Sequence, residues 1–203
     1  MAKKLNLMVS NVLIICLCLF CGCKGDNNKS KSVENVGGVI HTNTFVPDSS
    51  INRKLLLNND RSLQEFYQNV NTLKLIEFVR ESPIIAFCNM SKSEYLFAYQ
   101  YEGNTANEFS CFEVGYFDKK IESYSQSNYK EFATESGLRL GLSLVDVERI
   151  KGKDYTKQGN KIIYQISDPN SAFLRNYNMP EYFLECDLQQ NKVIKIKFGF
   201  VNP

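Results

Sequence analysis

The chain has 203 residues, enough for one domain with an N-terminal extension. Apolar residues make up 43% and charged residues 23%, which supports a buried core and excludes disorder throughout. Lys and Arg number 24 against 22 Asp and Glu, and two lysines lie in a segment that we expect to be removed, which leaves 22 of each. A nucleic-acid-binding protein needs a basic surface, so the balance argues against that class.

The N-terminus has the pattern of a secretory signal. Two lysines precede nine continuous apolar residues at 12–20, as in a secretory signal. This run is too short for a membrane-spanning helix, which needs about 20 apolar residues. Gly22 and Cys23, at the end of this run, resemble a bacterial lipoprotein signal, in which the cysteine after a small residue receives the lipid. The resemblance implies a signal peptide at 1–22 and a lipid-modified Cys23. Because Lys24 stands where inner-membrane lipoproteins often carry aspartate, it also implies the outer membrane.

We expect Cys23 and the residues up to 59 to form the lipidated end and a flexible tether. Residues 24–59 are rich in Asn, Ser, Lys and Asp and contain one aromatic residue, Phe45. The chain's only histidine, His41, lies here, which argues against Ser-His-Asp or Cys-His nucleophiles and against a histidine-rich zinc site. We therefore expect no catalytic residue, no cofactor and no metal site.

The sequence predicts that residues 60–203 form one globular body, with sub-halves 60–140 and 141–203 as an alternative. Alternating apolar residues between turn signals predict strands at 72–79, 84–88, 95–101, 109–117, 162–167, 182–188 and 193–200. Pro83 is expected to end the first of these strands. Capping residues and apolar spacing predict short helices at 61–68, 129–134, 143–151 and 171–177.

The last two predicted strands fit one hairpin register on both faces. Folding them about residues 190–192 places Asp187 opposite Lys195 and Glu185 opposite Lys197. The same register aligns apolar residues on the other face, Cys186 with Ile196 and Leu184 with Phe198. We interpret the charged residues as a solvated sheet face rather than as catalytic carboxylates.

An aromatic row occupies one face of a predicted strand, at Tyr95, Phe97, Tyr99 and Tyr101. Leu96 and Ala98 point to the other face. If helices cover Leu96 and Ala98, the row is exposed and suits a protein or sugar partner. The alternative is a row packed in the core, with tyrosine hydroxyls at its edge.

Three cysteines follow Cys23, all in predicted strands, at Cys88, Cys111 and Cys186. Exported proteins can form disulfides, and a Cys88–Cys111 bond is one interpretation. In the other, all three are small buried apolar residues.

A capped-helix motif stands at Gly141, Ser143, Val147 and Gly152. Gly141 permits a sharp entry, Ser143 caps the helix, Val147 packs on the sheet and Gly152 ends the helix. With the strands that follow, these spacings resemble the SmpA/OmlA-type small lipoproteins of the outer-membrane β-barrel assembly machinery, which share a fold with β-lactamase-inhibitor-like proteins. The resemblance covers residues 141–200 and implies a two-layer α+β topology.

Together these patterns predict an α+β fold, with an antiparallel β-sheet meander and a few short helices in two layers. The expected protein is a membrane-anchored envelope lipoprotein, with its lipid in the membrane, whose soluble domain binds another protein and catalyses no reaction. Two alternatives stay open. One is a small-ligand or glycan-binding module that uses the aromatic sheet face, and the other is a tethered hydrolase that works with carboxylates.

Overall fold

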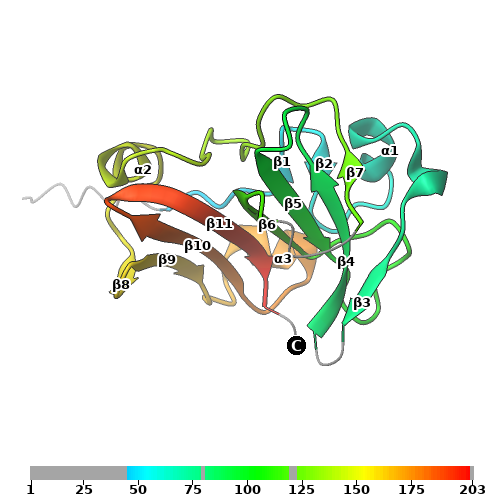
Figure 1. The fold of residues 1–203 in the computed structure, drawn as a ribbon. Coiled ribbons are helices and arrows are strands. Elements are labelled where there is room, and N and C mark those ends of the chain that lie inside the picture. The colour runs from blue at the N-terminus through cyan, green and yellow to red at the C-terminus, as the bar shows by residue number, and fades with distance from the viewer. Residues whose placement is uncertain (1–44, 79–80, 119–122, 202–203) are drawn as a thin grey trace, which may run out of the picture. The chain divides into compact units, whose positions relative to one another are not determined.

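The computed structural model describes residues 45–78, 81–118 and 123–201. They form a nine-stranded β-sheet, shown in Figure 1. In spatial order eight of its strands are β3 (Ile76–Phe78), β4 (Glu81–Cys88), β5 (Glu94–Tyr99), β6 (Cys111–Tyr116), β11 (Lys192–Phe200), β10 (Tyr182–Gln189), β9 (Lys161–Ile166) and β8 (Thr156–Gln158), paired antiparallel. The ninth strand, β7 (Ser125–Gln126), lies parallel to β4.

Three short α-helices and a small hairpin complete the fold. The helices are α1 (Ser62–Phe66), α2 (Leu144–Lys151) and α3 (Ala172–Tyr177), and a 3-10 turn, η1 (Val70–Thr72), follows α1. The hairpin joins β1 (Ser50–Ile51) to β2 (Leu55–Leu56). The predicted α+β class, an antiparallel sheet meander with a few short helices, is confirmed.

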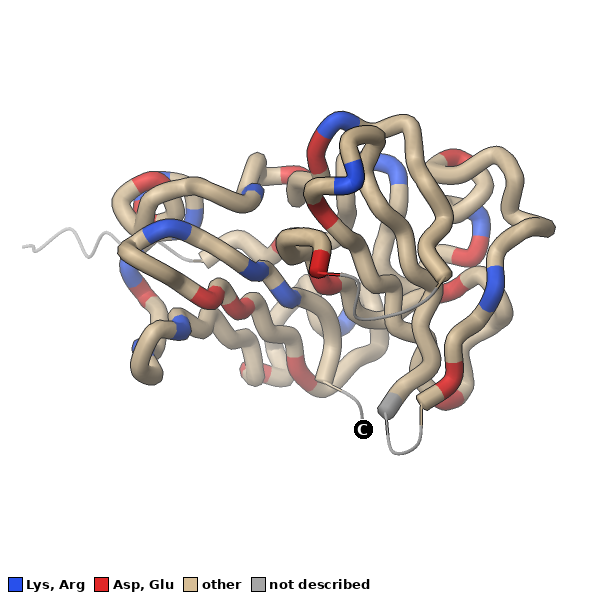
Figure 2. The backbone as a smooth tube through the Cα atoms, viewed as in Figure 1, with Lys and Arg blue, Asp and Glu red and all other residues tan. Residues whose placement is uncertain are grey.

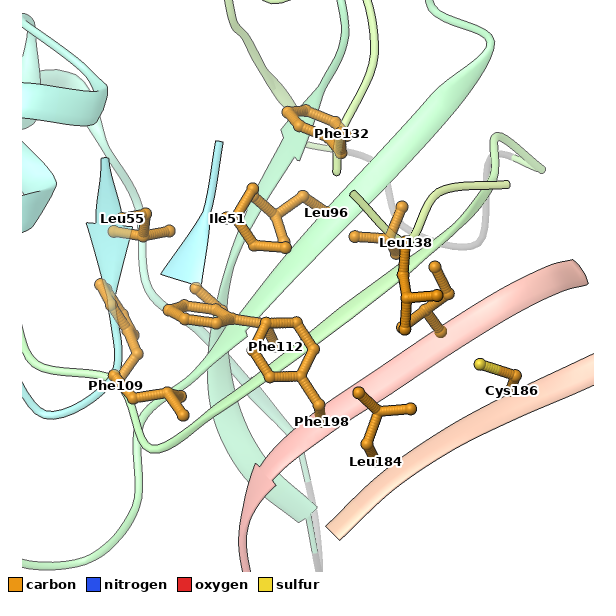
Figure 3. Close-up of a cluster of buried hydrophobic side chains, with 14 of the residues drawn as sticks. Ile51, Leu55, Leu96, Phe109, Phe112, Phe132, Leu138, Leu184, Cys186 and Phe198 are labelled. Carbon is orange, nitrogen blue, oxygen red and sulfur yellow. The ribbon is translucent and has the colours of Figure 1, made fainter. Parts of the chain in front are cut away.

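The main hydrophobic core lies on the face of the sheet that the helices cover. Leu63 of α1, Val147 of α2 and Leu174 of α3 share one buried cluster with the inward-facing residues of the strands. Figure 3 shows Ile51 and Leu138, which lie outside the large sheet, among the side chains of the same cluster. The three helices of the described residues all contact this one face, and none of them covers the opposite face of β9, β10 and β11.

The folded body begins earlier than the sequence predicted. Residues 1–44, which include the expected signal peptide, Cys23 and His41, lie outside the described residues. Residues 45–59, expected in the tether, instead form β1 and β2, and Asp48, Ile51 and Leu55 are fully buried. The tether prediction is therefore wrong for this part, because long-range contacts bury a segment whose composition is polar. Both predicted sub-halves contribute strands to one sheet.

Two other local predictions are wrong for identifiable reasons. Pro83 lies inside β4 instead of ending a strand, at a point where the β3–β4 register shifts, and bulges tolerate proline. Its carbonyl accepts a hydrogen bond from the Gln100 amide. The helix expected at 129–134 is an extended segment, because Thr134 bridges to Ile51 and the Ala133 carbonyl accepts from the Asn52 amide.

Candidate functional site

The hairpin register that the sequence predicts is confirmed at all four residue pairs. In the β10–β11 ladder Asp187 faces Lys195 and Glu185 faces Lys197, as Cys186 faces Ile196 and Leu184 faces Phe198 on the other side. The turn uses Gln190 and Asn191, both with positive φ, which suits a two-residue hairpin. The register places the charged side chains on the face that none of the described helices covers.

Neighbouring strands extend these charges into a two-dimensional pattern, which we call the charge lattice. It comprises Lys161 on β9, Glu185 and Asp187 on β10, Lys195 and Lys197 on β11, and Glu113 on β6. One cross-strand row reads Lys161, Asp187, Lys195, and the adjacent row reads Glu185, Lys197, Glu113. The signs therefore alternate across the strands, whereas along each strand they are the same, acidic on β10 and basic on β11. Figure 2 shows acidic and basic positions side by side along β10 and β11.

Ion pairs hold the lattice together. The Lys195 Nζ lies 2.7 Å from Asp187, and the Lys161 Nζ lies 2.6 Å from Glu185 and 3.9 Å from Asp187. Burial lowers the pKa of Lys195, but the hydrogen bond to Asp187 and the nearby carboxylates outweigh burial and raise it. About a quarter to a third of each of these four side chains stays exposed, so the lattice is ordered and also accessible.

Glu113 joins the charge lattice to the aromatic row. Its carboxylate accepts hydrogen bonds from the Tyr95 hydroxyl at 2.7 Å and the Tyr99 hydroxyl at 3.2 Å, and the Lys197 Nζ lies 3.9 Å away. Burial, together with the Glu113 charge, raises the pKa of Tyr95 above its ordinary value. Gly115 lies opposite Tyr95, and a Cβ there would lie 2.6 Å from the Tyr95 ring. Glycine is therefore required for this close approach.

The aromatic row is not the exposed platform that one prediction described. Helices do cover the Leu96 and Ala98 face, yet Tyr95 is only 2% exposed and Phe97 only 6%. Phe117 and Tyr124 pack against the row, and the Phe97 and Tyr124 rings stack 6.1 Å apart. Of the four, Tyr99 and Tyr101 remain partly exposed, and the Tyr101 hydroxyl donates to the Phe200 carbonyl.

A hollow of about 360 Å³ opens at one end of the charge lattice. It lies next to the Gly115–Lys195 pair, at which the pairing of β6 with β11 ends. Its lining is Tyr95, Gly115, Tyr116, Asp118, Asp187, Gln189, Ile194 and Lys195. Sequence reasoning missed this hollow because it depends on where two strands, far apart in the chain, separate.

The capped-helix motif folds as its residues predict. The Ser143 hydroxyl accepts from the Asp146 amide, and the Asp146 carboxylate accepts from the Ser143 amide, which forms a capping box. Val147 is fully buried against the core, and Gly152 ends the helix with a positive φ. Gly141 also has a positive φ, as a sharp entry requires.

The helix carries one feature that the sequence did not indicate. The Lys151 Nζ lies 2.8 Å from the Asp48 carboxylate, and both side chains are only 1% exposed. The Lys151 ammonium also donates to the Val46 carbonyl at 2.7 Å, and Asp48 accepts from the amide and the hydroxyl of Ser136. This buried pair fastens the N-terminal edge of the body to α2.

The three cysteines of the body are free and buried. Strand β5 separates Cys88 on β4 from Cys111 on β6, so the Cys88–Cys111 disulfide is not formed. Burial raises the pKa of the Cys111 and Cys186 thiols to about 12. Both thiols are therefore protonated at neutral pH and behave as small apolar side chains.

The described part of the chain contains neither a helix suited to cross a membrane nor a metal-binding cluster. No helix there combines the length and apolar character needed to cross a membrane. No group of three or more histidine, cysteine, aspartate or glutamate side chains in that part is placed to hold a metal ion. Comparison with family models, with curated proteins and with solved structures gives no match to this chain.

Proposed function

We propose that this chain is a lipid-anchored protein of the bacterial envelope and that its folded body binds another protein. The anchor is the lipid on Cys23, which becomes the first residue of the mature chain when residues 1–22 are removed. Between Cys23 and the first described residue, Phe45, lie 21 residues. A segment of this length can span at most about 80 Å when fully extended.

The charge lattice is the observation that supports protein binding. Three lysines and three carboxylates alternate on a rigid β-sheet face, and their ion pairs fix their positions. A fixed pattern of alternating charges selects a partner with the complementary pattern and disfavours others, because misplaced like charges repel. The lattice is formally neutral, so it provides specificity rather than general attraction to acidic or basic molecules.

The same geometry supports binding over hydrolysis. A carboxylate-based hydrolase needs two acidic groups that converge on one cleft in different environments. Glu185 and Asp187 instead lie along one strand, and each faces a lysine. The capped helix α2 supports our proposed likeness to SmpA/OmlA-type lipoproteins, and we propose that the partner is a protein of an envelope assembly.

Site-specific cross-linking in intact cells tests this function. A photoreactive benzoylphenylalanine replaces Gln189, which is exposed beside the lattice, and a control chain carries it at Val145, exposed on α2. We expect a defined protein adduct from position 189. Neutralising one ion pair with Asp187→Asn and Lys195→Gln should abolish the adduct, whereas Lys153→Gln, at an exposed lysine, should not.

The anchor is tested in the same cells. Cys23→Ser should end acyl labelling and move the protein to the soluble fraction. The proposal fails if the Cys23→Ser chain keeps its acyl label in the membrane. It also fails if position 189 gives no adduct that depends on the Asp187–Lys195 pair.

A further inference from the structure

A second concave surface lies beside α3. This hollow of about 420 Å³ is lined by Pro169, Leu174, Arg175, Asn178, Met179 and Pro180. Its volume falls within the range of about 300–1,000 Å³ that ligand pockets commonly have. None of its residues belongs to the charge lattice, so any binding here is a separate property of the molecule.

Most of the lining is apolar. Two proline rings and the half-buried Met179 supply most of the apolar surface, since Leu174 is only 2% exposed. Methionine is unbranched and flexible, so it adapts to side chains of different shapes. The hollow therefore suits one aliphatic or aromatic side chain of a ligand.

Arg175 supplies a positive charge at the same hollow. It is exposed, and no carboxylate of the described residues lies within ion-pair distance of its guanidinium. A guanidinium presents two parallel N–H groups that match the two oxygens of a carboxylate. The carboxamide of Asn178 stands nearby as a further polar group.

The frame around Arg175 is held in place before any ligand arrives. On α3 the Phe173 ring packs against the Tyr182 ring, with 5.2 Å between the ring centroids, and the Tyr177 ring packs against the Phe200 ring, with 5.0 Å between the centroids. The helix end is closed by hydrogen bonds from the amides of residues 178 and 179 to the carbonyls of 175 and 174. A backbone that is already fixed reduces the ordering cost of binding.

We infer that this hollow binds the C-terminus of a partner polypeptide, with the last apolar side chain in the hollow and the terminal carboxylate on Arg175. A terminal apolar residue carries both groups on one Cα atom, which suits an apolar wall with a guanidinium beside it. The inference takes its ligand class from the proposed protein-binding function, but it depends on different residues.

Isothermal titration with the full chain carrying Cys23→Ser tests the assignment. The probes are an acetylated pentapeptide that ends in leucine with a free carboxylate, and the same peptide with a C-terminal amide. We expect the acid to bind at least about tenfold more tightly than the amide, the effect of one charge-assisted contact. Arg175→Gln should remove this preference and Arg175→Lys should restore it in part, whereas Arg149→Gln, at an exposed arginine of α2, should leave it unchanged.

Three results would overturn the inference. Equal affinity for acid and amide would show that no carboxylate is recognised, and unchanged binding by Arg175→Gln would place the carboxylate elsewhere. Tighter binding of dodecanoate than of the peptide acid would assign the hollow to a lipid-derived carboxylate. Arg175→Gln leaves the charge lattice intact, so the cross-linked adduct from position 189 tests the proposed function separately. If that adduct forms but the peptide acid is not preferred, only the assignment of the hollow beside α3 has failed. Melting temperatures of all variants confirm that each one is folded.

Discussion

The buried pair between Asp48 and Lys151 gives the sharpest test of how the body is held together. Lys151→Met keeps most of the volume of the side-chain stem and removes the ammonium. The Asp48 carboxylate then stays buried with its hydrogen bonds from Ser136, at 2.9 and 3.0 Å, but without a cation.

The size of the effect follows from burial. Both side chains are 1% exposed, so water cannot replace the lost partner. Breaking a buried ion pair by removing one member costs about 3–5 kcal/mol, and the total stability of a domain is about 5–15 kcal/mol. We therefore expect Lys151→Met to lose about a fifth or more of the free energy of unfolding. The double variant Asp48→Asn, Lys151→Met removes both charges and should recover most of the loss, because a buried pair is often replaceable by neutral groups.

Urea unfolding of the Cys23→Ser chain, followed by circular dichroism, measures these differences. Lys153→Met is the matched control, because this neighbouring lysine is 80% exposed and should change stability by less than about 1 kcal/mol. Brief proteolysis should also cut Lys151→Met between residues 45 and 59 more readily than the parent chain. If Lys151→Met and Lys153→Met unfold at the same urea concentration, the pair does not fasten the N-terminal edge and the reasoning is refuted.

Three further predictions follow from the burial of single side chains. Val147→Asp should lower the free energy of unfolding by several kcal/mol, because it buries an unpaired charge. Val145→Asp is the control, because Val145 lies on the same helix but is 67% exposed, and it should change stability by no more than about 0.5 kcal/mol. Equal urea midpoints for the two variants would contradict the packing of α2. The buried thiols should not react with a disulfide reagent at pH 8 until urea unfolds the chain. Burial raises the pKa of the Cys111 and Cys186 thiols from 9.0 to about 12. Between pH 9 and 12 the unfolded chain therefore loses thiol protons that the folded chain keeps. The free energy of unfolding should fall as the pH rises through this interval. Cys111→Ala should make that fall shallower, and an unchanged slope would count against a buried thiol at this position.

The features that the sequence predicted correctly are those set by neighbouring residues. The register of β10 and β11 follows from a period of two and from opposite charges that meet across a short turn. The α2 capping box lies within four residues, from Ser143 to Asp146. Such patterns need no knowledge of distant parts of the chain.

The features that the sequence missed depend on partners far along the chain. Asp48 looks like a linker residue until Lys151 is found beside it. Tyr95 and Phe97 are buried because residues 117 and 124 pack over them, which alternation within one strand cannot indicate. The hollow at Arg175 depends on which side of α3 faces the core, and six residues of helix give too short a pattern to decide this.

The order of the strands has a consequence for how the chain folds. Strands β3 to β6 are successive neighbours, as are β8 to β11, so most pairings join segments that are close in sequence. The contact between β6 and β11 unites the two groups through five residue pairs, from Gly115 with Lys195 to Cys111 with Gly199. This long-range closure loses more chain entropy than the local hairpins do, so we expect it to limit the folding rate. Until it forms, β6 and β11 present two matching open edges, and at high concentration a second copy can fill them and yield a domain-swapped dimer.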